Sequence, residues 1–341
     1  MGIACTAAKR LRIPLAAVAV ALAAVAAGGC GGNGSEATVD PPPPANARDF
    51  PKVQQRSFRD VVSPMLQGPE LAQSTPVLEP GKNRFGFALI DTGNRQIGAL
   101  DVVLYVSRGL DETAKGPYPA RYEPIDVKPQ FQSQTSAQDS SAAHGVYVAE
   151  IPFRSAGSYV VSAVTKLDRK FVATSPAQVT VRASAPAPDV GSKAVSVHTP
   201  TVASAHGDVA SIDTRVPPSY MHEVDLVDAL KRQRPVVLLF ATPALCQSRV
   251  CGPVADVTEQ VKSKYGDEAD FIHMEIYRDN DVNKGVRPQV VSWGLCSGRG
   301  NSLICNEPFL FTINRRGKVA AQLQGAFSVS ELEGAVRKAL R

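Results

Sequence analysis

Four of the six cysteines in this 341-residue sequence lie within its last 100 residues, and two cysteines close together in a chain can do redox chemistry or form a structural disulfide. Cys246 and Cys251 are separated by four residues, and Cys296 and Cys305 by eight. Cysteines of exported proteins usually form disulfides. Four cysteines allow three connectivities, and proximity favours pairing within each of the two sets. A thiolate can attack a disulfide sulfur to form a mixed disulfide, which a second thiol resolves. The first pair is therefore a candidate either for thiol–disulfide exchange or for a structural disulfide.

A strand and a helix are predicted on either side of the first pair. Val236–Phe240 is a continuous apolar run, which is typical of a strand buried on both faces. Pro253 suits the first turn of a helix that ends at Gly266. Unpaired N–H groups at a helix start stabilise a thiolate and lower the pKa of its thiol, so a cysteine at such a junction can be reactive. If the helix begins at Gly252 or Pro253, both cysteines lie in the preceding loop.

Residues 190–341 as a whole predict a mixed α/β domain. A second strand is predicted at Phe271–Ile276, and a hairpin is predicted from the strands Phe309–Ile313 and Val319–Leu323. Ser328–Glu331 has the pattern of a capping box, which begins a last amphipathic helix. A parallel strand pair, an antiparallel hairpin and a final helix follow one another in the layout of the thioredoxin fold.

Three short segments of this region resemble those of thioredoxin-like proteins, in particular of the extracytoplasmic redoxin type. Val190–Ala194 is similar to the opening segment of redoxins. The segment Leu239–Cys246 runs from the end of a predicted strand to a cysteine, and the thioredoxin-like fold carries its active cysteine at this position. Glu307–Pro308 precedes a strand at the position of the cis-proline of that fold. The resemblance covers less than half of the chain and implies a thioredoxin-like fold for this part of it.

The resemblance also implies roles for three residues of the candidate site. Cys246 would be the exposed nucleophile, and Cys251 would resolve the mixed disulfide. Pro308, if its peptide bond is cis, would place backbone beside the sulfur for a substrate chain to pair with. The spacing departs from the family pattern, because four residues separate the cysteines where the family has two. The two sulfurs therefore cannot share one short first turn of the helix in the usual way.

The predicted charges near the first pair also depart from the family pattern. Leu238 and Leu239 occupy the place where thioredoxins keep a buried carboxylate that helps to move protons. Glu307 would place a negative charge near the sulfur, which raises the pKa of the thiol and slows its reaction. Arg249 lies close in the sequence and could compensate for that charge.

Cys296 and Cys305 enclose a loop of small polar residues directly before Pro308. A disulfide there would stabilise an insertion at the rim of the site, which is the usual role of extracellular disulfides. A second redox pair that relays electrons to the first is the alternative. An oxidising compartment argues against a four-cysteine zinc site. A lone histidine in a strand, such as His273, is more often a hydrogen-bonded core residue than a copper ligand. The sequence thus predicts neither a metal site nor a cofactor.

Residues 1–29 predict an export signal. A basic start is followed by the apolar stretch Ile13–Ala27, which has 15 residues and is short for a bilayer span of about 20. The run Ala27–Cys30 resembles a bacterial lipobox, in which Cys30 becomes the lipid-modified first residue of the mature chain. A plain secretory signal is the alternative. The Gly- and Pro-rich residues 30–64 would form a tether that holds the protein at the outer face of the cytoplasmic membrane.

Residues 65–183, between the tether and the α/β domain, predict an all-β domain. Short alternating apolar segments separated by turn residues suit about seven strands, the pattern of an immunoglobulin-like β-sandwich. Tyr159 starts a late strand in a run that resembles the tyrosine corner of such domains, and Val161 stands where antibody domains have their second cysteine. The Gln- and Ser-rich segment 130–143 predicts a long exposed loop. The Pro-rich residues 184–189 predict a linker.

Composition and charge limit the partners of the protein. The hydrophobic fraction of 44% and the charged fraction of 20% are those of a globular protein. The net charge of +5 gives no basic footprint for nucleic acid. The predicted function is thiol–disulfide exchange through Cys246 and Cys251, with exported protein thiols or a membrane thiol–disulfide electron donor as partners. The alternatives are a non-catalytic binding or scaffold lipoprotein with two structural disulfides, and a protein whose β-sandwich is the working part.

Overall fold

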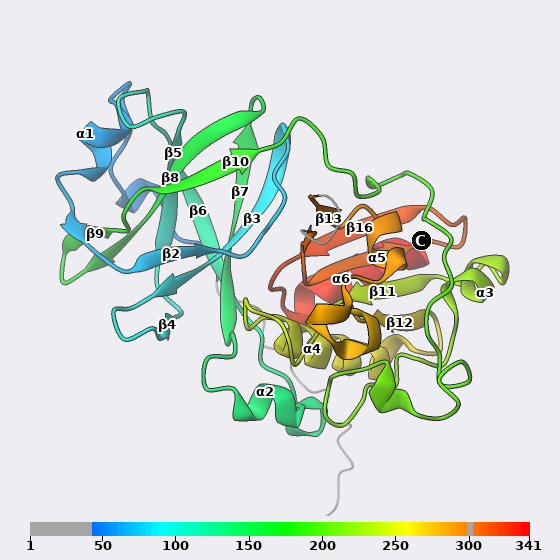
Figure 1. Ribbon diagram of the computed structural model, residues 1–341. Coiled ribbons are helices and arrows are strands. Elements are labelled where there is room, and N and C mark those ends of the chain that lie inside the picture. The colour runs from blue at the N-terminus through cyan, green and yellow to red at the C-terminus, as the bar shows by residue number, and fades with distance from the viewer. Residues whose placement is uncertain (1–42, 299–302) are drawn as a thin grey trace, which may run out of the picture. The chain divides into compact units, whose positions relative to one another are not determined.

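The computed structural model of the chain describes residues 43–298 and 303–341 (Figure 1). The predicted signal peptide at 1–29, the predicted lipidation site Cys30 and the first part of the predicted tether lie outside the described residues. Within the described ranges, none of the helices combines the length and the apolar character needed to span a bilayer.

Ten strands of the N-terminal region form one large mixed sheet. They are β1 (Leu66–Gln67), β2 (Glu70–Gln73), β3 (Gly81–Ile90), β4 (Gln96–Ile97), β5 (Val102–Ser107), β6 (Lys115–Pro124), β7 (Gly145–Phe153), β8 (Gly157–Leu167), β9 (Lys170–Ala173) and β10 (Ala177–Val181). Hydrogen bonds connect them in the order β1-β9-β8-β5-β6-β7-β3-β2, with β10 paired to β8 and β4 paired to β3. The β1–β9 pair is parallel, and the other pairs of this sheet are antiparallel.

Both faces of this sheet are buried along its central strand β5. Along β5, Leu104 belongs to one apolar cluster, whereas Val103 and Tyr105 belong to a second cluster together with Phe58 of the short helix α1 (Phe58–Val62). The Tyr159 hydroxyl donates to the backbone carbonyl of Ser155 at 2.9 Å, a contact to nearby backbone like that of a tyrosine corner. An immunoglobulin-like sandwich of two separate sheets is not shown, because the strands bond onward into a single sheet. The alternation of apolar residues predicts strands but does not specify which strands pair.

The segment predicted as a long exposed loop is folded and partly buried. It contains the 3₁₀ helix η2 (Pro129–Phe131) and the helix α2 (Gln134–Gln138). Ser133 is fully buried, and its backbone N–H and its hydroxyl both donate to the Asp256 carboxylate at 3.1 Å. The Gln134 N–H donates to the carbonyl of Val216 at 2.7 Å. We call residues 129–143 the covering segment. Its small polar side chains indicated exposure, but here they satisfy buried polar groups of the C-terminal region.

The C-terminal region has the strand order of the thioredoxin fold. Its elements are η3 (Val209–Ser211), α3 (Leu226–Lys231), β11 (Val236–Phe240), α4 (Cys251–Tyr265), β12 (Asp270–Met274), η4 (Arg278–Asn280), η5 (Val282–Lys284), α5 (Pro288–Ser292), β13 (Cys296–Ser297), β14 (Ile304–Cys305), β15 (Phe309–Ile313), β16 (Val319–Gln324) and α6 (Val329–Leu340). A further 3₁₀ helix, η1 (Ala47–Asp49), lies in the N-terminal region. The four-stranded sheet runs β12-β11-β15-β16, with β11 parallel to β12 and antiparallel to β15, and with β15 antiparallel to β16. The predicted thioredoxin-like arrangement of strands and helices is thus confirmed.

Apolar side chains fill both faces of this smaller sheet. Alternate residues of β11 enter two different clusters: Leu239 packs in the cluster that contains α4 and α6, and Phe240 packs with Trp293 in the other. This double burial explains the uninterrupted apolar run in the sequence. The predicted capping box at the start of α6 is present, because Ser328 and Glu331 each accept a hydrogen bond from the backbone N–H of the other. The sheet and its helices together fix the loop between β11 and α4, where the first cysteine pair lies.

Candidate functional site

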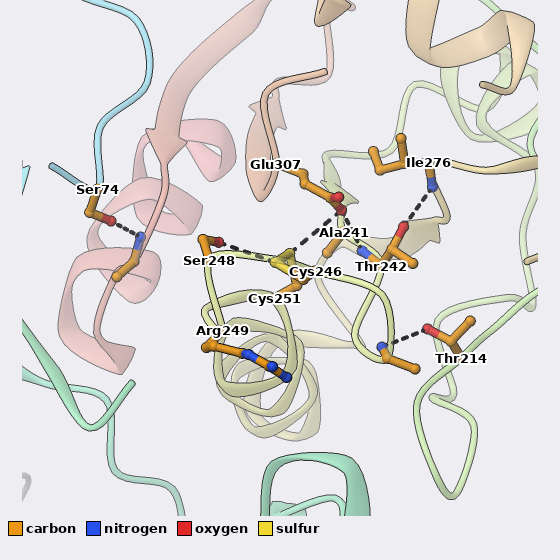
Figure 2. Close-up of a disulfide and its surroundings, with 12 residues drawn as sticks. Ser74, Thr214, Ala241, Thr242, Cys246, Ser248, Arg249, Cys251, Ile276 and Glu307 are labelled. Carbon is orange, nitrogen blue, oxygen red and sulfur yellow. Dashed lines mark hydrogen bonds between the residues drawn. A yellow bond between two sulfur atoms is a disulfide. The ribbon is translucent and has the colours of Figure 1, made fainter. Parts of the chain in front are cut away.

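Both pairs of cysteines form disulfides, as proximity predicts. Cys246, in the loop after β11, is bonded to Cys251, and their Cα atoms are 5.9 Å apart (Figure 2). Cys296 is bonded to Cys305 across the short strands β13 and β14. The helix α4 begins one or two residues earlier than predicted, so Cys251 is its first residue and only Cys246 lies in the preceding loop. No side chain caps the helix start. The sulfur of Cys251 therefore lies at the positive end of the α4 dipole, which stabilises a thiolate there.

The first disulfide is nearly inaccessible, in contrast to the exposed nucleophile that was predicted. Cys246 is 5% exposed and Cys251 is 0% exposed. Both belong to the apolar cluster that includes Ile125 and Val146 from the N-terminal region. The sequence could not show this burial, because Ile125 and Val146 stand 100 or more positions before the cysteines in the chain.

The covering segment also contacts the loop that carries the disulfide. The Ala143 N–H donates to the carbonyl of Arg249 at 3.1 Å, and a guanidinium nitrogen of Arg249 lies 3.3 Å from the Asp139 carboxylate. At the start of α4, a Cβ on Gly252 would lie 2.9 Å from the hydroxyl of Ser136, so a larger residue there would require the Ser136 side chain to shift. These contacts hold the loop that carries the disulfide against the covering segment.

Glu307 contacts the second sulfur of the pair. Its Oε2 lies 3.5 Å from Sγ of Cys251 and accepts a hydrogen bond from the Thr242 N–H at 2.9 Å (Figure 2). Burial raises the pKa of Glu307, and the charge of the nearby Glu275 raises it further. The hydrogen bonds from Thr242 and the charge of His273 lower it, and the resulting pKa is about 7. A carboxyl group with this pKa can give or take a proton at neutral pH. Glu307 thus provides at this site the carboxyl group that β11 lacks.

Other predicted site residues have different surroundings. The Arg249 side chain lies apart from the two sulfurs (Figure 2), and its guanidinium pairs with Asp139. The peptide bond between Glu307 and Pro308 is cis, and the carbonyl of Pro308 accepts a hydrogen bond from the N–H of Gly325 at 2.9 Å. The effects of Arg249 and Pro308 on the sulfur chemistry remain predictions.

Two residues beside the disulfide complete the hydrogen-bond network of the loop. The hydroxyl of Ser248 lies 3.2 Å from Sγ of Cys246, where it can donate to the sulfur (Figure 2). Glu275, which follows β12, is buried and accepts hydrogen bonds from the N–H and hydroxyl of Thr214 at 2.7 and 2.9 Å. The Thr214 hydroxyl in turn accepts from the N–H of Ala244 at 3.1 Å. The loop between β11 and α4 is thereby bonded to a buried carboxyl group that the sequence did not reveal.

Replacing Glu307 with glutamine is expected to remove a pH dependence of disulfide reduction. Below pH 7 the carboxyl group is protonated and can neutralise the leaving Cys251 thiolate; above pH 7 its negative charge repels that thiolate. Between pH 6 and pH 8, the ratio of wild-type to Glu307→Gln reduction rates should therefore fall about tenfold. The rates are measured with the same thiol reagent, so that its own ionisation cancels in the ratio. A ratio that stays constant over this range would contradict the role assigned to Glu307.

Replacing Asp139 with alanine is expected to make the first disulfide easier to reduce. The Asp139–Arg249 ion pair is partly exposed, so its loss should lower the free energy of opening the covering segment by about 1 kcal/mol or less. The reduction rate of Cys246–Cys251 should rise roughly twofold to fivefold, because it follows the open population. Alkylation and mass mapping report both disulfides in the same sample, and Cys296–Cys305 serves as the internal control. Equal rates in the two proteins would show that this segment does not control access.

Comparison with known proteins gives a partial match. No family model matches the chain, and no curated protein matches it. Among solved structures, the chain is similar to a Chlorobium tepidum protein proposed to be the thiol:disulfide interchange protein DsbE, with 18% identity over 46% of this chain and 100% of that chain and a TM-score of 0.30. It is also similar to a thioredoxin-family thiol:disulfide interchange protein from Chlorobium tepidum TLS, with 16% identity over 46% of this chain and 99% of that one and a TM-score of 0.28.

Proposed function

We propose that this protein carries out thiol–disulfide exchange on exported proteins through Cys246 and Cys251. One observation carries the proposal. The disulfide joins the loop after β11 to the first residue of α4, and a carboxyl group with a pKa of about 7 lies 3.5 Å from its second sulfur. Together, a helix start and a proton donor at one sulfur make that sulfur a good leaving group.

The geometry supports a two-step exchange. A substrate thiolate attacks Sγ of Cys246 and forms a new S–S bond as the Cys246–Cys251 bond breaks. The electron pair leaves on Sγ of Cys251, and the proton of the Glu307 carboxyl group neutralises it. A second substrate thiolate then attacks the substrate sulfur of the mixed disulfide, so the substrate disulfide forms and Cys246 leaves as a thiolate. The Ser248 hydroxyl can donate a hydrogen bond to that thiolate.

The reaction is reversible, and its partners set its direction. The steps above oxidise two substrate thiols and reduce the cysteine pair; the same steps in reverse reduce a substrate disulfide. We propose a membrane thiol–disulfide partner that returns the pair to its starting state. We also propose that Cys30 is lipid-modified and that the protein is anchored at the outer face of the cytoplasmic membrane. The sequence patterns support these proposals.

Catalysis by the purified full-length protein tests the proposed exchange. The rate of disulfide formation in a reduced, exported model protein is measured in a glutathione buffer, with and without catalytic amounts of the protein. We expect an acceleration of at least about tenfold, equivalent to 1.4 kcal/mol of barrier. A Cys296→Ser/Cys305→Ser variant, which retains the first pair, should accelerate the reaction equally. A rate equal to the uncatalysed rate would contradict the proposal.

The burial of the first pair favours a second candidate function. With Cys246 only 5% exposed, the disulfide could serve to hold the loop before α4 in a non-catalytic binding or scaffold lipoprotein. In that case both disulfides would stabilise the fold and neither would react with substrate thiols. The absence of catalysed exchange in the assay above, together with loss of stability on reduction, would support this candidate.

A further inference from the structure

A second group of chemically active side chains lies in the C-terminal region, and the exchange reaction does not use it. Asp213, in the loop after η3, is 2% exposed; His222, in the loop before α3, is 1% exposed; and His273, in β12, is 0% exposed. The backbone N–H of His273 donates to the carbonyl of Met221 at 2.9 Å, so the loop that carries His222 lies alongside β12. Three distant parts of the sequence thus bring an aspartate and two histidines together away from solvent.

One oxygen atom is the meeting point of the three side chains. Oδ2 of Asp213 lies 3.0 Å from Nε2 of His222 and 3.3 Å from Nδ1 of His273. One ligand atom from each residue lies within 4.8 Å of the other two. Nδ1 of His273 is buried and has no hydrogen-bond partner among the described residues, because its approach to Asp213 lacks hydrogen-bond alignment. An unpartnered ring nitrogen is therefore directed into a site that already contains a carboxylate oxygen.

The other hydrogen bonds of these residues orient them as metal ligands are oriented. Nε2 of His273 lies 2.9 Å from the carbonyl of Ala241. A neutral ring with its proton on Nε2, donated to this carbonyl, has the lone pair of Nδ1 facing Asp213. Metal-binding histidines commonly donate their second ring N–H to a backbone carbonyl in this way. The N–H and hydroxyl of Ser219 both donate to Oδ2 of Asp213 at 2.7 Å and hold the carboxylate in place.

A lone pair and a carboxylate oxygen at this separation repel each other unless a proton or a metal ion lies near both. A metal ion with a preference for imidazole nitrogen and carboxylate oxygen would lie near both and take the place of a proton. Two histidines and one carboxylate form a donor set that suits Zn²⁺.

We propose that Asp213, His222 and His273 bind a divalent transition metal ion of the Zn²⁺ type. The ligand atoms are Oδ2 of Asp213, Nε2 of His222 and Nδ1 of His273, which the surrounding backbone and Ser219 hold in position. The sequence predicts no metal site, because His273 stands alone in its strand pattern and its partners are about 50 and 60 positions away. This proposal does not depend on the proposed exchange reaction.

Zinc titration of the full-length protein in its fully oxidised form tests this site, because the sulfurs of both disulfides are then unavailable as ligands. The protein is stripped with a chelator, titrated with Zn²⁺, and analysed for bound metal and for its thermal unfolding midpoint. We expect one Zn²⁺ per chain and a midpoint that rises with Zn²⁺ concentration, because an ion that binds only the folded chain stabilises it. If the wild-type protein binds no Zn²⁺ and its unfolding midpoint does not change, the proposal is overturned. No variant is needed for that conclusion.

Matched histidine variants identify the ligands. His222→Gln and His273→Gln should each weaken Zn²⁺ binding by more than about 100-fold. Substitution of a residue that only contacts a metal ligand typically weakens metal binding by about 10- to 100-fold, and loss of a ligand should cost more. His198→Gln is the control, since His198 is exposed, pairs with Asp225 and lies outside the cluster. Asp213→Asn, which nearly preserves shape, is the second test if the histidine variants do not fold. Equal binding by the folded Asp213→Asn variant and the wild type would place the zinc elsewhere and overturn the assignment.

Discussion

Replacing Cys246 with serine is expected to reduce thiol–disulfide exchange to the uncatalysed rate, and replacing Cys251 with serine is expected to trap a mixed disulfide. Cys246 is the sulfur of the pair with some exposure, so it is the one that a substrate can reach. Without it no mixed disulfide forms. Without Cys251 the mixed disulfide forms, but the internal thiol that would reverse or resolve it is missing. Non-reducing mass spectrometry of each variant after incubation with a disulfide-bonded substrate distinguishes these outcomes.

Stability must be separated from chemistry in these variants. Loss of either disulfide removes a cross-link whose stabilisation is about 2–3 kcal/mol for loops of this length. The double variant Cys296→Ser/Cys305→Ser is the matched control, because it should lose similar stability and retain exchange. If this control loses exchange as completely as Cys246→Ser does, instability and not the loss of the nucleophile explains the result. If Cys246→Ser retains exchange, the first pair is not the reactive one.

Replacing Arg215 with alanine is expected to lower the free energy of unfolding by about 3–5 kcal/mol. Nε of Arg215 lies 2.9 Å from Oδ1 of Asp256, and both side chains are at most 5% exposed. The guanidinium also donates to the carbonyls of Pro217 and Phe131 at 2.8 and 2.7 Å. The substitution leaves the Asp256 carboxylate buried without its cation. Urea unfolding at equilibrium measures the effect.

The guanidinium of Arg215 bonds both to the covering segment and to α4, so we expect its loss also to loosen the covering segment and expose the first disulfide. Phe131 lies in the covering segment and Asp256 lies in α4. We therefore expect faster reduction of Cys246–Cys251 in Arg215→Ala than in the wild type under native conditions. Arg59→Ala is the control, because Arg59 pairs with Asp111 on the surface, where an exposed ion pair contributes little to stability. An Arg215→Ala protein as stable as this control would show that the buried pair does not hold the segment in place.

Local sequence patterns predicted much of the C-terminal fold. The apolar run of β11 indicated a strand buried on both faces, and Ser328 with Glu331 indicated the start of α6; both are present. These elements are set by neighbouring residues in the chain, so one sequence is enough to find them. The N-terminal sheet shows the limit, because strand pairing depends on contacts between distant residues that an alternating pattern does not specify.

The candidate site was predictable only where its residues are close to the cysteines in the sequence or match a motif. The disulfide pairing followed from proximity, and Glu307 was found because it precedes Pro308. The covering segment was missed because its Gln and Ser residues are equally typical of exposed loops. Glu275 and the aspartate–histidine cluster were missed because long-range contacts, which no local pattern reports, bring them to their places.

The reduction potential of Cys246–Cys251 tests the central claim most directly. The full-length protein is equilibrated in thiol buffers of defined potential, its free thiols are alkylated, and peptide mass mapping reports each disulfide separately. A potential at or above roughly −270 mV, the range of catalytic pairs, is the predicted result for Cys246–Cys251. A value below about −300 mV would mark this pair as structural and contradict the assignment of exchange chemistry to it.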